Sequence, residues 1–248
     1  MAAAFVIGVG IALAVGLRRK ADPPQPPPPP PPASNPLVRA RDLLAKDDFE
    51  GAAEAVRETF KRGDTAEAHA LLGFIQYRKG DRVGARSLLD RAQSLDAGWS
   101  MTYLYRGQVH LSLSDWRAAR ADFDEFVKRE PKRADGYALR ADARFHQEEL
   151  AGAIEDAVLA LKIDPDCGEA YFARGCAFAG LGRDDEALRD YTRCIGLRPA
   201  HVGALVNRGN LRARRGEGLA AAMDWERAVE ADPSLKPRLQ PLIDKARE

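Results

Sequence analysis

Small and large apolar residues alternate with charged residues at a fixed spacing through most of the chain. Four prolines mark this spacing, because each lies 34 residues after the one before: Pro131, Pro165, Pro199 and Pro233. A fixed period of this length is typical of stacked supersecondary units. When the proline is set at position 32, the units that it closes begin at Ser100, Ala134, Gly168 and Val202.

Each unit is predicted to hold two antiparallel helices. Position 20 is always alanine, and position 8 is always small: Gly107, Ala141, Gly175 and Gly209. Position 24 is large in three of the units: Phe123, Tyr191 and Trp225. Small residues at 8 and 20 let two helices approach closely, while large residues at 4 and 24 fill the space around that contact. The proline can neither continue a helix nor sit inside one, so it ends the second helix.

This pattern resembles the tetratricopeptide repeat (TPR) family, which has a large residue at 4, a small one at 8, alanine at 20 and 27, a large one at 24 and proline at 32. The resemblance implies an all-α fold, a right-handed superhelix of about six helix-turn-helix repeats over residues 37–235. The expected repeats are 33–65, 66–99, 100–133, 134–167, 168–201 and 202–235. Residues 236–248 carry one apolar stripe at helical spacing, which predicts a capping helix.

Charged residues at positions 7 and 23 depart from the family pattern. Position 7 is arginine in four repeats: Arg106, Arg140, Arg174 and Arg208. Position 23 is aspartate in the same four: Asp122, Asp156, Asp190 and Asp224. In repeat 66–99 both positions are apolar, Leu72 and Leu88, so charge occurs at both places or at neither. We therefore predict a structural Arg–Asp bridge inside each of the four repeats, which fixes register more than it adds stability.

Residues 1–20 are predicted to be an N-terminal membrane anchor. Met1–Leu17 contains no charged side chain, and Arg18, Arg19 and Lys20 follow it at once. A helix of this length reaches about 25 Å, near the lower limit for crossing a bilayer. A cleaved signal peptide and a buried or interfacial helix are the alternatives. The positive-inside rule places the repeats in the cytosol, on an organelle outer membrane or a bacterial inner membrane.

Residues 21–36 are predicted to be a proline-rich linker. Nine of the ten residues in Pro23–Pro32 are proline, which favours an extended polyproline II rod that acts as a spacer. A ligand for SH3 or WW domains is the alternative, although no basic residue closely flanks the prolines in the usual docking pattern.

Composition and motifs give no support for catalysis or for nucleic-acid binding. The net charge is only +1, which argues against a phosphate-binding surface. The three cysteines, Cys167, Cys176 and Cys194, form no C-x-x-C pair, and the four histidines take different repeat positions. No nucleotide-binding, hydrolase or zinc-protease motif occurs. We expect no enzyme activity, no cofactor, no metal and no small-molecule substrate.

The family resemblance assigns partner binding to the inner face of the superhelix. In TPR proteins this face is lined by first-helix positions 2, 5, 6, 9, 12 and 13. The residues predicted to bind a partner here are Leu71, Phe74, Tyr77, Leu104, Tyr105, Leu111, Phe145, Phe172, Asn207 and Asn210. They would form an apolar, aromatic groove suited to an amphipathic helix or an extended segment of a protein partner. Phe74 and Tyr105 are the expected anchors, and Asn207 is expected to bond the ligand backbone.

The sequence thus predicts a non-catalytic, membrane-anchored scaffold or receptor. Its layout is similar to that of TPR receptors on the outer membranes of organelles. A secreted or periplasmic assembly factor, or an accessory subunit of an enzyme complex, is the alternative.

We expect the full chain to sediment with membranes and to resist carbonate extraction, because the uncharged run Met1–Leu17 partitions into lipid. A chain that begins at Ala33 should remain in the soluble fraction. Fractionation followed by N-terminal sequencing checks this, and recovery of a mature protein that begins near Val15 would contradict the anchor.

Overall fold

The computed structural model describes residues 35–248, which form thirteen α-helices, one short 3₁₀ helix and no strand. The first six helices are α1 Pro36–Leu44, α2 Phe49–Phe60, α3 Ala66–Arg78, α4 Arg82–Leu95, α5 Ser100–Ser112 and α6 Trp116–Arg129. The next six are α7 Ala134–His146, α8 Leu150–Ile163, α9 Gly168–Gly180, α10 Asp184–Leu197, α11 Val202–Arg214 and α12 Gly218–Ala231. The chain closes with η1 Pro233–Leu235 and α13 Lys236–Arg247. The all-α class is confirmed for this part of the chain.

The predicted anchor and nearly all of the predicted linker lie outside the described residues. None of the helices between residues 35 and 248 combines the length and the apolar character that a membrane crossing requires.

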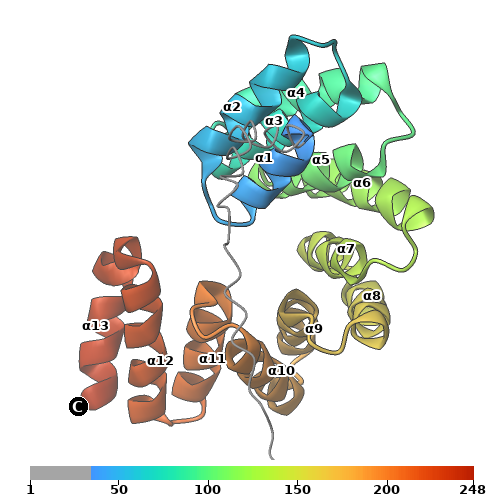
Figure 1. The fold of residues 1–248 in the computed structure, drawn as a ribbon. Helices are drawn as coiled ribbons and strands as arrows, with labels where there is room; N and C mark the ends of the chain where they lie inside the picture. Colours follow the sequence, from blue (N-terminus) through green and yellow to red (C-terminus); the bar gives the residue numbers. More distant parts are fainter. Residues whose placement is uncertain (1–34) are drawn as a thin grey trace, which may run out of the picture. The chain divides into compact units, whose positions relative to one another are not determined.

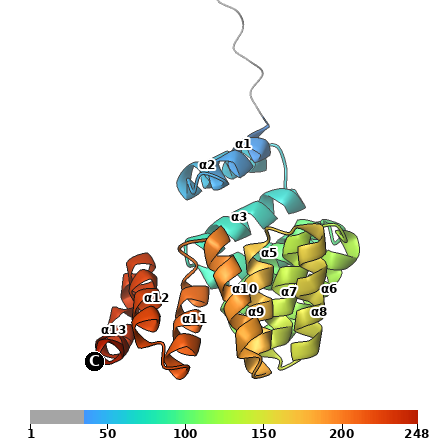
Figure 2. The same ribbon diagram turned by 90° about the horizontal axis from the view of Figure 1, so that it is seen from below.

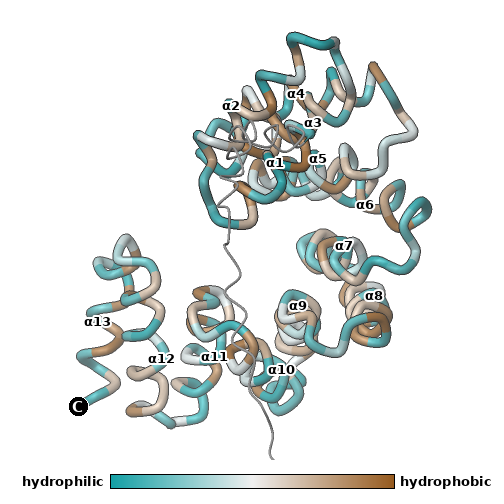
Figure 3. The backbone as a smooth tube through the Cα atoms, viewed as in Figure 1, coloured by the Kyte–Doolittle hydropathy of each residue, from teal (hydrophilic) through white to brown (hydrophobic). Residues whose placement is uncertain are grey.

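Successive helices pair into hairpins, and the hairpins stack one upon the next. The tightest contacts join the two helices of a pair, such as α3 with α4 and α9 with α10. Along the arc, α7 and α9 lie on the inner side while α8 and α10 lie outside (Figure 1), and the turned view shows these helices side by side (Figure 2). Apolar and polar stretches alternate along each helix (Figure 3), so each buries one stripe against its neighbours.

Close approach inside each hairpin depends on the small residue at position 8. A Cβ added to Gly107 would lie 2.5 Å from the ring of Phe123, and one added to Gly209 would lie 2.6 Å from the indole nitrogen of Trp225. The repeat 134–167 uses two small residues instead, and both Ala141 and Ala157 are fully buried. Positions 8 and 24 therefore share one fixed volume, as the sequence pattern predicts.

The turn inside every hairpin uses the same left-handed backbone residue at position 15. These residues have positive φ: Asp47, Gly80, Ser114, Glu148, Gly182 and Gly216. Only glycine adopts this conformation freely, and for other residues it costs about 1–2 kcal/mol. The turn geometry therefore follows from the packing of the two helices rather than from the residue at the turn.

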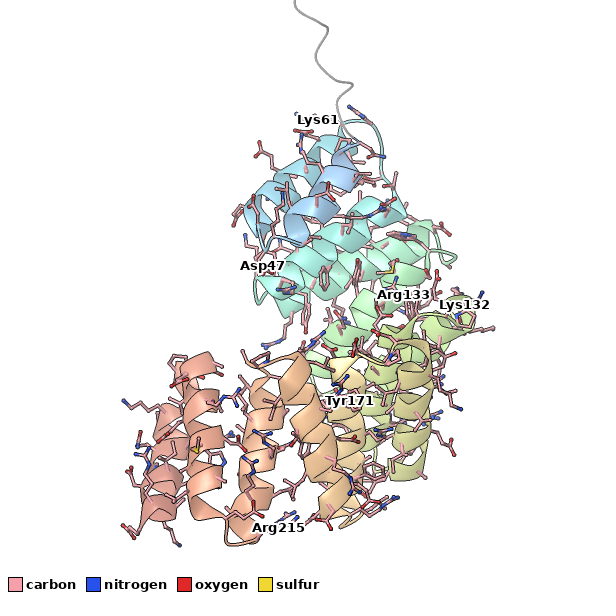
Figure 4. All side chains as sticks on the ribbon, turned by 60° about the horizontal axis from the view of Figure 1, so that its bottom comes forward. Asp47, Lys61, Lys132, Arg133, Tyr171 and Arg215 are labelled. Atoms are coloured by element: carbon pink, nitrogen blue, oxygen red, sulfur yellow. The ribbon has the colours of Figure 1, made fainter. Side chains whose placement is uncertain are left out.

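Aspartates begin several second helices, but they serve in different ways. Asp48 accepts a hydrogen bond from the N–H of Gly51 at 2.9 Å and so caps α2. Asp184 and Asp185 lie in the first turn of α10 without capping it. Asp184 pairs with Arg214, and Asp185 pairs with Arg215, which Figure 4 places at the α11–α12 turn. These two carboxylates therefore tie neighbouring repeats together.

The four Arg–Asp bridges are confirmed, and each is bidentate. The Nε and Nη2 donors reach the two carboxylate oxygens at 3.0 and 2.7 Å for Arg106–Asp122. The same distances are 2.8 and 2.6 Å for Arg140–Asp156, and 2.9 and 2.6 Å for Arg208–Asp224. For Arg174–Asp190 they are 2.7 and 2.8 Å. Planar, parallel donation of this kind sets the relative position of the two helices.

The bridges also join neighbouring repeats. The third donor nitrogen of the arginine reaches position 25 of the preceding repeat, at 3.1 Å for Arg106–Asp90 and 2.9 Å for Arg140–Asp124. Arg208 donates in the same way to Thr192 at 3.1 Å. The equivalent residue before Arg174 is Val158, which cannot accept a hydrogen bond.

Asp190 depends on a single cation, unlike Asp156 and Asp224. Asp156 also pairs with Arg144 at 3.0 Å, and Asp224 also pairs with Arg212 at 2.9 Å. Position 11 of the Asp190 repeat is Phe178, so Arg174 is the one cation that bridges to Asp190 among residues 35–248.

The last helix, α13, covers the end of the stack. Leu239 and Ile243 are 1 % and 2 % exposed, and they join the core that contains Trp225. Without this helix the apolar face of α12 would meet solvent.

We expect Arg174→Leu to lower the free energy of unfolding by about 1–3 kcal/mol, because it leaves the buried Asp190 carboxylate without a cation. Adding Asp190→Leu should recover much of that loss. Arg208→Leu is the matched control, because Asp224 still pairs with Arg212 in that variant. Adding Asp224→Leu to Arg208→Leu should therefore recover less stability than adding Asp190→Leu to Arg174→Leu. Urea unfolding of the double-mutant cycle measures the coupling, and strictly additive losses would mean that the pair does not interact.

Candidate functional site

Two of the residues predicted to bind a partner lie in the core instead. Leu71 and Leu104 are 1 % and 3 % exposed. Leu71 packs with Val56 and Ile75, and Leu104 belongs to the core around Phe123. Both are corrected to structural residues, because these core clusters enclose their side chains.

Phe74, Tyr77 and Tyr105 form a half-buried aromatic cluster on α3 and α5. The rings of Phe74 and Tyr105 stack with centroids 4.4 Å apart and an interplanar angle of 21°, and Tyr77 lies 6.2 Å from Phe74. The guanidinium of Arg78 lies 4.9 Å from the ring centroid of Phe49. Burial raises the pKa of Tyr105 above its ordinary value. The cluster thus combines packing between repeats with a partly open aromatic edge.

Leu111 and Phe172 are also half-buried, and both are engaged with neighbours. Leu111 packs beside the core around Phe123. The ring of Phe172 lies 4.6 Å from His201, and a Cβ on Gly203 would come within 2.9 Å of it. Phe172 therefore supports the start of α11, and its ring offers little free surface.

Phe145, Asn207 and Asn210 come together in one open pocket between α9 and α11. The pocket has a volume of about 190 Å³. Its other lining residues are Cys176, Ala179, Gly180, Tyr191, Leu211 and Arg214. The space exists because α9 and α11 meet at few residues, whereas α7 and α9 pack closely along their length.

The amide groups in this pocket have fixed orientations. The indole N–H of Trp225 donates to Oδ1 of Asn210 at 3.1 Å, which turns the Asn210 NH₂ group away from the indole. The Asn207 NH₂ group donates to Sγ of Cys176 at 3.5 Å, and the Tyr191 hydroxyl donates to the same sulfur at 3.5 Å. Asn210 therefore presents an amide donor to a ligand, and Asn207 presents a carbonyl acceptor.

The sequence patterns did not mark Cys176, Tyr191 or Trp225 as parts of a site. Tyr191 and Trp225 occupy position 24 and were identified as packing residues, which they also are, at 1 % and 3 % exposed. The Tyr191 hydroxyl reaches α9 and the Trp225 indole N–H reaches α11, in each case across the small residue at position 8. This role could have been inferred from the fact that buried Tyr and Trp need hydrogen-bond partners.

The cysteines have no character of nucleophiles. Burial raises the pKa of the Cys176 thiol to about 11 and that of Cys194 to about 12, and it also raises the pKa of Cys167. Thiols with such values carry almost no thiolate at neutral pH, so they act as small packing residues. Cys176 is only 5 % exposed.

Comparison with known proteins agrees with this architecture. The tetratricopeptide repeat family matches residues 37–100, 104–170 and 172–235. Human tetratricopeptide repeat protein 36 is 30% identical over 124 residues, which cover 48% of this chain and 61% of that protein. Human mitochondrial import receptor subunit TOM70 is 26% identical over 149 residues, which cover 57% of this chain and 24% of that protein.

The chain spans only part of such relatives. It covers 10% of yeast Superkiller protein 3, to which it is 26% identical over 53% of its own length. It also covers only 61% of human tetratricopeptide repeat protein 36.

Solved structures share the fold. A thermophilic TPR protein from Thermus thermophilus has a TM-score of 0.64 at 19% identity, over 73% of this chain and 98% of that one. YrrB, described as a TPR protein with an unusual peptide-binding site, has a TM-score of 0.53 at 20% identity, over 79% of this chain and 98% of that one. From the matched repeats and the stacked helix hairpins together, the chain belongs to the tetratricopeptide repeat family.

Proposed function

We propose that this chain is a non-catalytic, membrane-anchored interaction protein that holds a segment of a partner protein against its first helices. The TPR fold is typically a protein-interaction scaffold without catalysis, and proteins of the family mediate protein–protein interaction. The specific groove and the membrane anchor are the parts that we add.

The pocket between α9 and α11 carries the proposal. Phe145 and Leu211 supply apolar walls, while Asn207 and Asn210 supply one acceptor and one donor whose orientations Cys176 and Trp225 fix. A peptide backbone offers the complementary pair, since each residue has one N–H and one C=O. Preorganised amides lose little side-chain entropy on binding, which favours affinity. A segment with an apolar side chain beside an accessible backbone amide fits this pocket.

The aromatic cluster is the second contact of the proposed groove. Phe74 and Tyr77 are half-buried on α3 and Tyr105 on α5, so the open edge of their rings can take an apolar side chain of the same partner. Rigid aromatic side chains give large contact area at low entropy cost.

The relatives fit a receptor or scaffold. One of them is named a mitochondrial import receptor subunit, and the fold of another protein, YrrB, holds a peptide-binding site. The anchor itself rests on the uncharged run Met1–Leu17 and on the three bases that follow it.

A photo-crosslinking amino acid in place of the exposed Asn210 should capture a partner protein from native membranes, whereas the same probe at Met223, which is 64% exposed on α12, should not. For the captured and purified partner, Phe145→Ser with Asn207→Ala should weaken binding at least tenfold, about 1.4 kcal/mol. Phe74→Ser with Tyr105→Ser tests the second contact in the same titration.

The control for both pairs is Met223→Ser, which should leave affinity unchanged. The melting temperature separates binding from folding, because groove residues should change capture more than stability. Equal loss of both would make these side chains core, and unchanged affinity would place the partner on another surface.

A further inference from the structure

Asp142 is a carboxylate on the inner helix α7, near the pocket residue Phe145 in sequence, and it has no arginine or lysine partner among residues 35–248. It lies on α7, one turn before Phe145, and its side chain is 29% exposed. It takes position 9 of its repeat, and the residues at position 9 of the next two repeats, Cys176 and Asn210, both line the pocket. Among residues 35–248, no donor forms a hydrogen bond with it, and its one ion-pair contact is Nε2 of His146 at 3.7 Å.

The acidic residues at position 2 of the first helices α3, α7 and α9 are paired with arginine. Asp135, also on α7, pairs with Arg133, which Figure 4 shows at the α6–α7 turn. Glu169 at the same repeat position pairs with Arg198. The buried Asp156 pairs with two arginines, Arg140 and Arg144.

Position 9 is otherwise uncharged in the repeats that span residues 66–235. Its other occupants are Phe74, Gln108, Cys176 and Asn210. A neutral side chain thus fits the same place on the other first helices, so packing does not require a carboxylate there. Burial raises the pKa of Asp142, because the ionised form is poorly solvated and weakly compensated.

His146 cannot easily move closer to supply the missing charge. Its ring stacks on Trp116 with centroids 4.0 Å apart and an interplanar angle of 11°, and a second contact joins it to Phe145 at 5.2 Å. On the far side of the pocket, Arg214 is already paired with Asp184 at 3.1 Å. Among residues 35–248, Asp142 therefore has no arginine or lysine partner, and the imidazole of His146 is its one ion-pair contact.

We propose that Asp142 is a specificity-determining residue that binds a lysine or arginine side chain of the partner segment. This inference rests on the proposed function and names the chemistry of its partner, a protein segment with a basic residue next to an apolar one. An acidic segment would meet Asp142 with like charge, and a purely apolar one would bury the carboxylate further without a cation.

The geometry also sets the spacing in the partner. Asp142 and Phe145 are three residues apart on one helix, so their Cβ atoms lie about 5–6 Å apart. Basic and apolar side chains that are three or four residues apart on a helix, or two apart on a strand, match this distance.

The test selects binders for the immobilised full chain from a displayed library of random twelve-residue peptides. Wild-type protein should enrich peptides with lysine or arginine at one position near an apolar residue. For a selected peptide, Asp142→Asn should weaken binding at least tenfold, and Asp142→Lys should prefer the same peptide with glutamate in place of its basic residue. Asp135→Asn is the matched control on the same helix and should change affinity less than twofold, because Arg133 already neutralises that carboxylate.

The outcomes separate the two claims. Peptides that depend on Phe145 and Asn207 but show no basic preference, or no sensitivity to Asp142→Asn, would overturn this inference and leave the proposed function standing. Selection of no peptide, or of peptides indifferent to Phe145 and Asn207, would overturn both. Concentration-dependent self-association that Asp142→Lys abolishes would identify a second copy as the occupant and overturn the assignment to a partner protein.

Discussion

The close contact between the two helices of each repeat is the constraint on which the structure depends. Positions 8 and 24 share one volume, filled as glycine with an aromatic ring in Gly107–Phe123 or as two alanines in Ala141–Ala157. Once that contact forms, the turn must be short, and position 15 adopts a left-handed backbone even where it is Glu148. The hairpin then presents Arg and Asp at positions 7 and 23 to each other, and a bidentate bridge fixes its register.

This constraint explains how much of the fold the sequence could predict. Arg174 and Asp190 are 16 residues apart within one hairpin, so their pairing follows from the hairpin geometry alone. Contacts between hairpins are different, because they depend on how each pair stacks on the next. The bond from Arg208 to Thr192 and the tie between Asp184 and Arg214 were therefore not predicted.

The sequence predicted only part of the groove, for the same reason. The family pattern assigns positions 5 and 6 to the inner face, yet Leu71 is buried in the core with Val56, and Leu104 is buried in the core around Phe123. Asn207 also takes position 6, but it lines a pocket because α9 and α11 separate there. A 34-residue period describes an average repeat, whereas exposure is set by the differences between successive interfaces.

Residues that depart from the repeat pattern are therefore the ones that can indicate function. A repeated packing unit has many equivalent positions, and an amino acid that breaks the series at one of them without a packing gain has another cause. Phe178 breaks the polar series around Arg174, but it packs against the core that contains Trp225, so packing accounts for it. Neutral residues take the position of Asp142 in the other repeats that span residues 66–235, and its carboxylate carries a desolvation cost that only His146 offsets among residues 35–248. A cost of this kind at an open pocket is more simply explained by a charge that arrives with a ligand than by the stability of the free protein.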